Sequence, residues 1–193
     1  VYHRVKNNLQ IVDGLLLLQS RDLDDPEAIQ GLADLRSRIY ALGLVHAQLM
    51  ASKNLETFDI APFLQELTEN IVAGGGRAVA VDVRSCPLEV SLDFAVPLGL
   101  LLTELITNSL KHAFPDGGGR IQVSLERDAS GDAVLTVADD GPGNRSDPAV
   151  LGGKPGMGAS IIAGLAKQLS ATLTVRDDGG RTTIVAIPAS EFA

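Results

Sequence analysis

The sequence predicts an α+β chain, in which an N-terminal helical hairpin is followed by an α/β sandwich with a mixed sheet. Apolar residues recur at helical spacing through roughly the first 50 residues, whereas short strand and helix patterns alternate from about residue 54 onward. A length of 193 residues with 45% apolar and 21% charged side chains allows a packed core. We therefore expect two domains, over residues 1–53 and 54–193.

The first helix is expected from the start of the chain to about Arg21. Apolar side chains recur every three or four positions, which is the pattern of a helix with one buried face. The seam is Val5, Leu9, Val12 and Leu16, widened by Ile11, Leu15 and Leu18. The opposite stripe is polar, with His3, Asn7, Gln10 and Gly14.

The second helix is expected to begin at Asp25 and Pro26 and to end near Met50. Asp is a good N-cap and Pro is favoured at the first helical position. A heptad-like seam follows, made of Leu32, Leu35, Ile39, Leu42, His46 and Leu49. Because two such helices cannot bury both apolar faces by themselves, we expect a homodimer that forms a four-helix bundle. For His46 we expect a partly buried, hydrogen-bonded side chain.

The remainder of the chain alternates between helix and strand patterns. Asp93 is expected to cap a long helix that reaches about Phe114. Other helices are expected over 59–73 and 157–169; strands over 78–84, 87–92, 120–127, 133–139, 171–177 and 182–188; and a Gly/Pro-rich loop over 140–155.

Charge and composition exclude several classes of protein. The chain has 16 basic and 24 acidic side chains and a formal net charge of −8, so binding to nucleic acid is not expected, because phosphate contacts need clustered Lys and Arg. The single cysteine excludes an internal disulfide. No apolar run reaches the ~20 residues that a membrane helix needs. We expect a cytoplasmic chain, preceded by further sequence because helical pattern begins at once at Val1.

Polar residues share one face of the long helix. Glu104, Asn108 and either Lys111 or His112 are spaced for this face. Amide and carboxylate oxygens suit Mg²⁺ bridging phosphates, and Lys111 suits the phosphates themselves. The glycines of DDGPG and GKPGMG let backbone approach a ligand, and the helix after Gly158 offers its N-terminus to phosphate.

Together these segments resemble the motifs of sensor histidine kinases. TELITNSLKHAF, DDGPG and GMGASII resemble the asparagine box and two glycine boxes of the GHKL ATPase superfamily. HRVKNNLQIV resembles the phosphoacceptor box of the HRVKNNLQ (HisKA_2-type) class of sensor histidine kinases. The resemblance implies dimerisation and phosphotransfer helices over 1–53, and an ATP-binding domain of the GHKL (Bergerat) fold over 54–193.

The resemblance also implies roles for individual residues. His3 would be phosphorylated, Asn108 would ligate Mg²⁺, and Asp139 would bind the adenine amino group of ATP. Lys111 and His112 are candidates for phosphate contact. Gly141, Gly143, Gly156, Met157 and Gly158 would shape the lid over the nucleotide, and Thr182 or Thr183 matches the Thr near the final strand.

In this interpretation the chain is the core of a bacterial, cytoplasmic kinase. It would phosphorylate His3 from Mg-ATP and pass the phosphoryl group to an Asp of a response regulator receiver domain. An upstream sensor domain, and any membrane attachment, would lie before Val1. Two alternatives remain open: a phosphotransfer protein or receiver phosphatase with weak ATP use, and a GHKL ATPase or serine kinase whose N-terminal helices only dimerise.

The chain departs from conventional histidine kinases in several places. It has no Trp, so it lacks the tryptophan motif of the sister class, and its lid has no Phe. Arg4 follows His3 where an acidic proton acceptor is usual, which leaves Glu104 and water as candidate acceptors. Arg4 is then a candidate to steady the γ-phosphate or the receiver. Asn7 matches the position whose amide orients a hydrolytic water in kinases that also dephosphorylate their partner.

The negative charge is unevenly distributed. Residues 1–53 carry six basic and six acidic side chains, so the whole excess of acid lies in residues 54–193. This fits a site that presents phosphates through Mg²⁺ and backbone amides rather than a basic patch. We therefore expect strict metal dependence.

Overall fold

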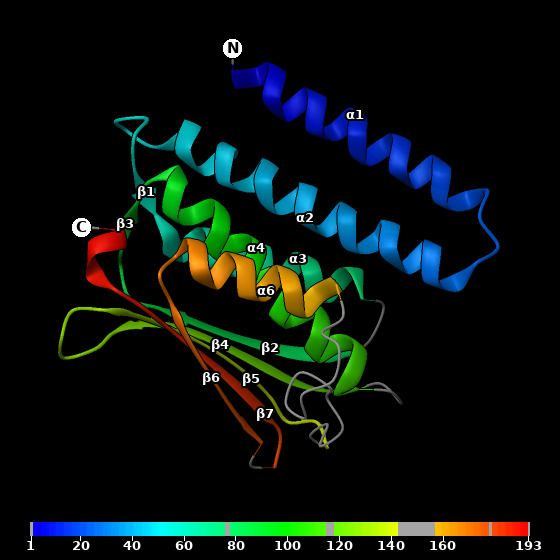
Figure 1. Cartoon of the computed structure of the whole chain (residues 1–193). Helices are drawn as coiled ribbons and strands as arrows, with labels where there is room; N and C mark the ends of the chain where they lie inside the picture. Colours follow the sequence, from blue (N-terminus) through cyan, green and yellow to red (C-terminus); the bar gives the residue numbers. More distant parts are fainter. Residues whose placement is uncertain (1, 76–77, 115–117, 143–156, 178, 193) are drawn as a thin grey trace.

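A computed structural model of the chain describes residues 2–75, 78–114, 118–142, 157–177 and 179–192, without the side chains of residues 2–6 and 157. It has three layers, and Figure 1 shows them stacked. The helical hairpin lies outermost, a layer of three helices lies in the middle, and a five-stranded sheet closes the opposite side. This is the α+β architecture that the sequence predicts.

The hairpin consists of α1 (Tyr2–Arg21) and α2 (Pro26–Ala51). Asp25 is the N-cap of α2, and its carboxylate accepts a hydrogen bond from the Glu27 backbone N–H at 3.0 Å. The expected start of this helix is thus confirmed, because local capping chemistry alone determines it. In the described part of the chain, no helix is long and apolar enough to cross a membrane.

The two hairpin helices leave much of their apolar surface uncovered. Arg36 on α2 pairs with Asp13 on α1, Nε to Oδ1 at 2.7 Å, and Leu9 packs close to Gly43. The exposed fractions of Ile11, Leu15 and Leu18 are 61%, 60% and 58%. The residues that widen the seam of the first helix therefore remain largely unburied within one copy of the chain, whereas Leu9 and Leu16 of the seam itself are half-buried.

The sheet is mixed, in the order β2-β4-β5-β7-β6, with only the β2–β4 pair parallel. Its strands are β2 (Val79–Ser85), β4 (Gly119–Arg127), β5 (Ala133–Asp139), β6 (Thr172–Asp177) and β7 (Arg181–Ile187). In β4 and β5 buried and less buried residues alternate, because one face packs on helices and the other faces solvent.

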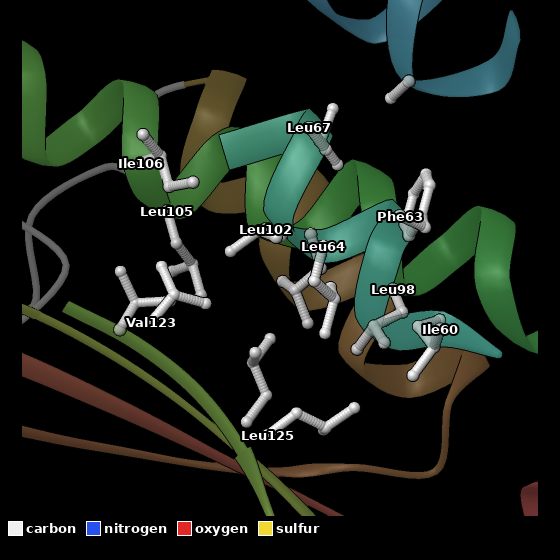
Figure 2. Packing of buried hydrophobic residues seen from close by; sticks show 14 of the residues in the cluster. Ile60, Phe63, Leu64, Leu67, Leu98, Leu102, Leu105, Ile106, Val123 and Leu125 are labelled. Carbon is white, nitrogen blue, oxygen red and sulfur yellow. The ribbon is translucent and has the colours of Figure 1, made fainter. Parts of the chain in front are cut away.

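Three helices cover one face of this sheet: α3 (Ile60–Gly74), α4 (Leu92–His112) and α6 (Met157–Gln168). Figure 2 shows side chains of α3 and α4 meeting those of β4 in one apolar core. Ala41, Val45 and Leu49 of α2 belong to the same buried cluster. Helix α2 therefore lies between α1 and the sandwich and is packed against both (Figure 1).

Three local expectations are corrected. The cap of α4 is Ser91 rather than Asp93, because the chain enters the helix directly after β3 (Glu89–Val90) and the Ala95 N–H bonds the Ser91 carbonyl. The helix ends at His112, two residues before Phe114. The strand expected over 87–92 is only β3, which pairs with an unexpected strand, β1 (Phe58–Asp59). A short 3-10 helix, Ala189–Glu191, follows β7.

Candidate functional site

The polar stripe of α4 is not a solvated helix face. The Glu104 side chain is 8% exposed, and its carboxylate is held by Arg38 of α2. Arg38 Nε lies 2.6 Å from Oε1 and Nη2 lies 3.2 Å from Oε2, which is a two-pronged arrangement. This hydrogen bond raises the pKa of the Arg38 guanidinium further above its ordinary value. Glu104 is therefore already paired.

Two turns further along the same stripe, α2 also contacts α4. Lys111 Nζ lies 2.6 Å from Oδ2 of Asp34, and both side chains are partly buried, with 32% and 22% of their surfaces exposed. His112, which follows Lys111, is exposed at the end of α4. Of the two phosphate candidates, only Lys111 thus lies on the buried stripe with Glu104.

The N-terminus of α6 meets this stripe. A Cβ built on Gly158 would lie 3.6 Å from Oε2 of Glu104 and 3.8 Å from Oδ1 of Asn108. A carboxylate oxygen and an amide oxygen therefore converge on the N-terminus of α6, the end of a helix at which backbone N–H groups point outward. Hard oxygen donors beside such N–H groups fit a magnesium-bound phosphate chain. The described residues contain no cluster of three His, Cys, Asp or Glu side chains that could hold a metal ion by themselves.

Asp139 ends β5 in a cradle of donors. Its buried carboxylate accepts hydrogen bonds from Ser109 Oγ at 2.7 Å, from the Gly141 N–H at 3.3 Å and from the Arg181 N–H at 3.2 Å. Ser109 follows Asn108 on α4, so one helix turn supports both the amide oxygen and this carboxylate. The arrangement fixes a negative group that can accept a hydrogen bond from a ligand amine.

Glycines permit the close approach of backbone around Asp139. A Cβ on Gly141 would lie 2.5 Å from the Ala113 Cβ, and one on Gly180 would collide with the Asp139 carbonyl oxygen. Gly141 therefore brings the end of β5 against the end of α4. Gly143 and Gly156, which the sequence places in the lid, lie outside the described residues, as does the side chain of Met157.

The structure separates the two threonine candidates. Thr183 is buried and pairs in register with Val137, so its side chain lies on the helix-facing side of the sheet, the side of Asp139. Thr182 lies on the opposite face and is half-buried. The face shared with Asp139 favours Thr183.

The N-terminal candidates lie apart from this site. His3 and Arg4 are in the first turns of α1, where only the backbone is described, and Asn7 is exposed on the same helix. The pairing of Asp13 with Arg36 places the middle of α1 level with the charged end of α2. From Asp13, His3 is about 15 Å further along the helix axis. The structure therefore does not bring His3 to α4.

Reasoning from the sequence missed Asp34, Arg38 and Ser109. Asp34 and Arg38 are four residues apart and so share a helix face, but nothing in the local pattern says that this face meets α4. His46 is half-buried as expected, but its Nδ1 has no hydrogen-bond partner, so the expected hydrogen bond is not found at this atom.

Comparisons with known proteins agree with the motifs. Residues 1–74 match the family model described as histidine kinase, and residues 94–191 match that of histidine kinase-, DNA gyrase B-, and HSP90-like ATPases. Blue-light-activated histidine kinase 2 of Erythrobacter litoralis is 31% identical over 97% of this chain and 55% of its own length. Sensor histidine kinase PdtaS of Mycobacterium tuberculosis is 30% identical over 97% of this chain and 38% of its own length.

The chain thus spans about half the length of these relatives, or less. Among solved structures, the histidine kinase domain of the Erythrobacter litoralis EL346 blue-light activated histidine kinase matches with a TM-score of 0.74 and 25% identity, over 95% of this chain and 97% of that one. The two family matches follow the order of the motifs. The chain therefore belongs to the sensor histidine kinases of the HRVKNNLQ class, with an ATP-binding domain of the GHKL superfamily.

Proposed function

We propose that the chain is the core of a two-component sensor histidine kinase, which phosphorylates His3 from Mg-ATP and passes the phosphoryl group to an Asp of a response regulator. One observation carries the proposal: the oxygens of Glu104 and Asn108 converge on the N-terminus of α6, while the next residue of α4, Ser109, holds the Asp139 carboxylate. Adenine and phosphate sites are thus supported by one helix.

In this proposal Asp139 accepts a hydrogen bond from the adenine amino group, with Thr183 on the same face of the sheet. Asn108 holds Mg²⁺, and Lys111 contacts the phosphates. Mg²⁺, when bound, neutralises the charge that develops on the phosphates during transfer. The ATP-binding domain would depend on this metal, because the whole excess of acidic side chains lies in residues 54–193 and would repel the phosphates.

The phosphoryl transfer balances as follows. A neutral imidazole nitrogen of His3 attacks the γ-phosphorus, so an N–P bond forms while the bond to the bridging oxygen breaks and ADP leaves. An imidazole with a pKa of about 6.5 is mostly neutral at cytoplasmic pH. The imidazole proton passes to Glu104 or to water. Arg4 steadies the transferred group or the receiver, and Asn7 orients a water for dephosphorylation of the receiver.

Dimerisation forms part of the proposal. Ile11, Leu15 and Leu18 present an exposed apolar stripe on α1, and Leu35 of α2 is 39% exposed. A second copy that packs its hairpin against this stripe would bury these side chains in a four-helix bundle. Transfer within one copy or between two copies would then be a property of the dimer.

Labelling with γ-labelled ATP and Mg²⁺ tests the proposal, using wild type, His3→Ala and Asn108→Ala. We expect acid-labile, base-stable label in wild type, none in His3→Ala, and a strong loss in Asn108→Ala. Label that is stable to acid would indicate a serine kinase, and ATP hydrolysis without labelled protein would indicate a GHKL ATPase. Label on His3 that moves to an added receiver domain would support the second step.

A further inference from the structure

Two ion pairs join α2 to the nucleotide motif of α4. Asp34 and Arg38 lie one helix turn apart on α2, and Glu104 and Lys111 lie two turns apart on α4. The pairs Arg38–Glu104 and Asp34–Lys111 each close at 2.6 Å. The charges alternate, with an acid and a base on each helix, so the two helices fit in one antiparallel register. We refer to these four residues as the α2–α4 clasp.

The clasp engages the charged groups that the proposed function assigns to phosphate chemistry. Lys111 cannot offer its ammonium group to a phosphate while Asp34 holds it, and both carboxylate oxygens of Glu104 are engaged by Arg38. Arg38 Nη2 lies 3.2 Å from Oε2 of Glu104, the atom that faces the N-terminus of α6. The arginine therefore stands at the edge of the phosphate site.

Packing alone does not require charges at this end of α2. Further along the same face, Ala41, Val45 and Leu49 are almost fully buried against the sandwich. The apolar end of α2 holds the helix on the sandwich, whereas the ion pairs at its charged end favour one position of α2 along α4. A groove of about 760 Å³ reaches Asp34 and Lys111, so solvent has access to this half of the clasp.

When α2 is docked on α4 in this way, the proposed phosphoacceptor His3 is held away from α4. The Arg36–Asp13 pair joins α1 to α2 only two residues from Arg38. His3 then lies about 15 Å further along α1, and α2 stands between α1 and α4 (Figure 1). Transfer from a nucleotide on α4 to His3 therefore needs the hairpin to move relative to the sandwich.

We infer that the α2–α4 clasp holds the kinase in a closed state that competes with nucleotide phosphates, so that Mg-ATP binding and release of the clasp are coupled. The inference rests on the proposed function, because it assigns Lys111 and Glu104 to the phosphate site. In the closed state Lys111 and Glu104 pair with Asp34 and Arg38 of α2. In the open state they face the nucleotide, and α2 is free to bring α1 into a new position.

The test compares Arg38→Gln with Arg36→Gln in the full chain. Both arginines are on α2 and both hold a carboxylate through two nitrogens, but Arg36 faces α1 whereas Arg38 faces α4. The measurement is the dissociation constant for a non-hydrolysable Mg-ATP analogue, determined by calorimetry. The apparent affinity for a ligand is reduced by the fraction of protein that is in the binding-competent state. A substitution that opens the clasp raises this fraction and should therefore tighten binding.

We expect Arg38→Gln to bind the analogue about 5- to 150-fold more tightly than wild type, the usual range of coupling between sites. Arg36→Gln should bind as wild type does. Asp34→Asn, which alters the more solvent-exposed pair and preserves side-chain size, should tighten binding by about two- to fivefold. This second variant keeps the test decisive if Arg38→Gln folds poorly, because it leaves Glu104 paired.

A second readout follows the hairpin directly. Nitroxide labels at the exposed positions Ala33 of α2 and Ala163 of α6, in a Cys86→Ser background, report their separation by pulsed electron paramagnetic resonance. We expect one short distance without nucleotide, and a longer and broader distribution with the analogue or with Arg38→Gln.

The outcomes separate the two proposals. Equal affinities in wild type, Arg38→Gln and Asp34→Asn, or a distance that the analogue leaves unchanged, would overturn the clasp while leaving the kinase assignment intact. Weaker binding by Arg38→Gln would also overturn it and would make Arg38 a phosphate ligand. If no variant bound the analogue at millimolar concentration, the proposed function would fail and the competition with it.

Discussion

The helical hairpin and the α/β sandwich solve the problem of burial in opposite ways. The sandwich buries Phe63, Phe94 and Leu102 almost completely, in a core that runs from α3 and α4 to the sheet. The hairpin exposes more than half of Ile11, Leu15 and Leu18 and has no net charge in residues 1–53. The sandwich thus buries its apolar core within one copy, whereas the hairpin leaves apolar side chains exposed that the proposed dimer would cover.

Helix α2 connects these two regions, and its two halves contact the sandwich through different kinds of interaction. Its apolar half joins the core of the sandwich through Val45 and Leu49, and its charged half meets the nucleotide motif through ion pairs. A phosphate would leave the apolar contacts unchanged, but in the inferred closed state it would compete with the ion pairs. A signal that shifts the hairpin can therefore act on the charged half while the fold of the sandwich persists.

The largest expected effect comes from opening the core of the sandwich. Phe63 is fully buried and its ring contacts Phe58 edge-on, with ring centroids 6.2 Å apart. Phe63→Ala should lower the free energy of unfolding by about 3–5 kcal/mol, because it removes a large side chain and leaves a cavity. Urea denaturation followed by circular dichroism measures this.

The matched substitution in the hairpin is Leu15→Ala. Because Leu15 is 60% exposed, one copy of the chain should lose no more than about 0.5 kcal/mol. The measurement is made at a protein concentration at which the chain is monomeric. Similar losses for the two variants would contradict the contrast between a self-sufficient sandwich and a dependent hairpin.

The proposed adenine side of the site should be the next most sensitive. Asp139→Asn replaces a carboxylate that accepts three hydrogen bonds by an amide that brings its own donors against Ser109 and two backbone N–H groups. The affinity for an Mg-ATP analogue should fall by at least about tenfold, since hydrogen bonds to charged groups contribute about 1.5–3 kcal/mol. Fluorescence titration of a labelled analogue measures it.

Ser109→Ala provides the graded control for Asp139→Asn. It removes one of the three donors and leaves the carboxylate in place, so the loss of affinity should be smaller than for Asp139→Asn. An unchanged affinity in both variants would mean that this cradle does not bind adenine.

The sequence could predict those parts of the fold that local chemistry determines. The cap at Asp25, the alternation along β4 and β5, and the motif residues on α4 depend on neighbours within a few positions. Ser91 replaces Asp93 as cap because the chain direction after β3 decides where the helix begins. That direction depends on the pairing with β1, which is too short to leave a pattern.

The clasp could not be predicted for a related reason. Arg38 and Glu104 are 66 positions apart, and Asp34 and Lys111 are 77 apart. Their contacts exist only because the apolar end of α2 docks on α4 in one register. Polar stripes on two separate helices look solvated when each is considered alone, and only tertiary packing shows that they cover one another.

A smaller effect is expected at the surface of the hairpin. Ile11→Asp combined with Leu15→Asp should raise the dissociation constant of the dimer at least about tenfold, because it places charges where apolar contact drives association. Gln10→Asp, on the exposed polar stripe of α1, should leave the dimer intact. Light scattering coupled to gel filtration distinguishes the two forms. A monomeric wild type, or a double variant that stays dimeric, would contradict the proposed bundle.

The smallest expected effect belongs to the sandwich and depends on pH. Hydrogen bonds from Ser130, through its hydroxyl and its N–H, lower the pKa of Asp128 below its ordinary value of 3.8, with help from the N–H of Asp132. Because the folded state binds this proton less readily than the unfolded chain, the stabilisation is present above the unfolded pKa and is lost as the pH falls through the folded pKa.

Asp128→Asn should therefore lower the melting temperature slightly at about pH 7, and the difference should shrink as the pH falls through the pKa of Asp128 in the folded state, because wild-type Asp128 then becomes protonated in both states. The carboxylate is fully exposed, so the difference should be small and should shrink further in high salt. Differential scanning fluorimetry across this range measures it. A difference that grew toward acidic pH would contradict this prediction. It would mean that the protonated form of Asp128, rather than the carboxylate, stabilises the loop between β4 and β5.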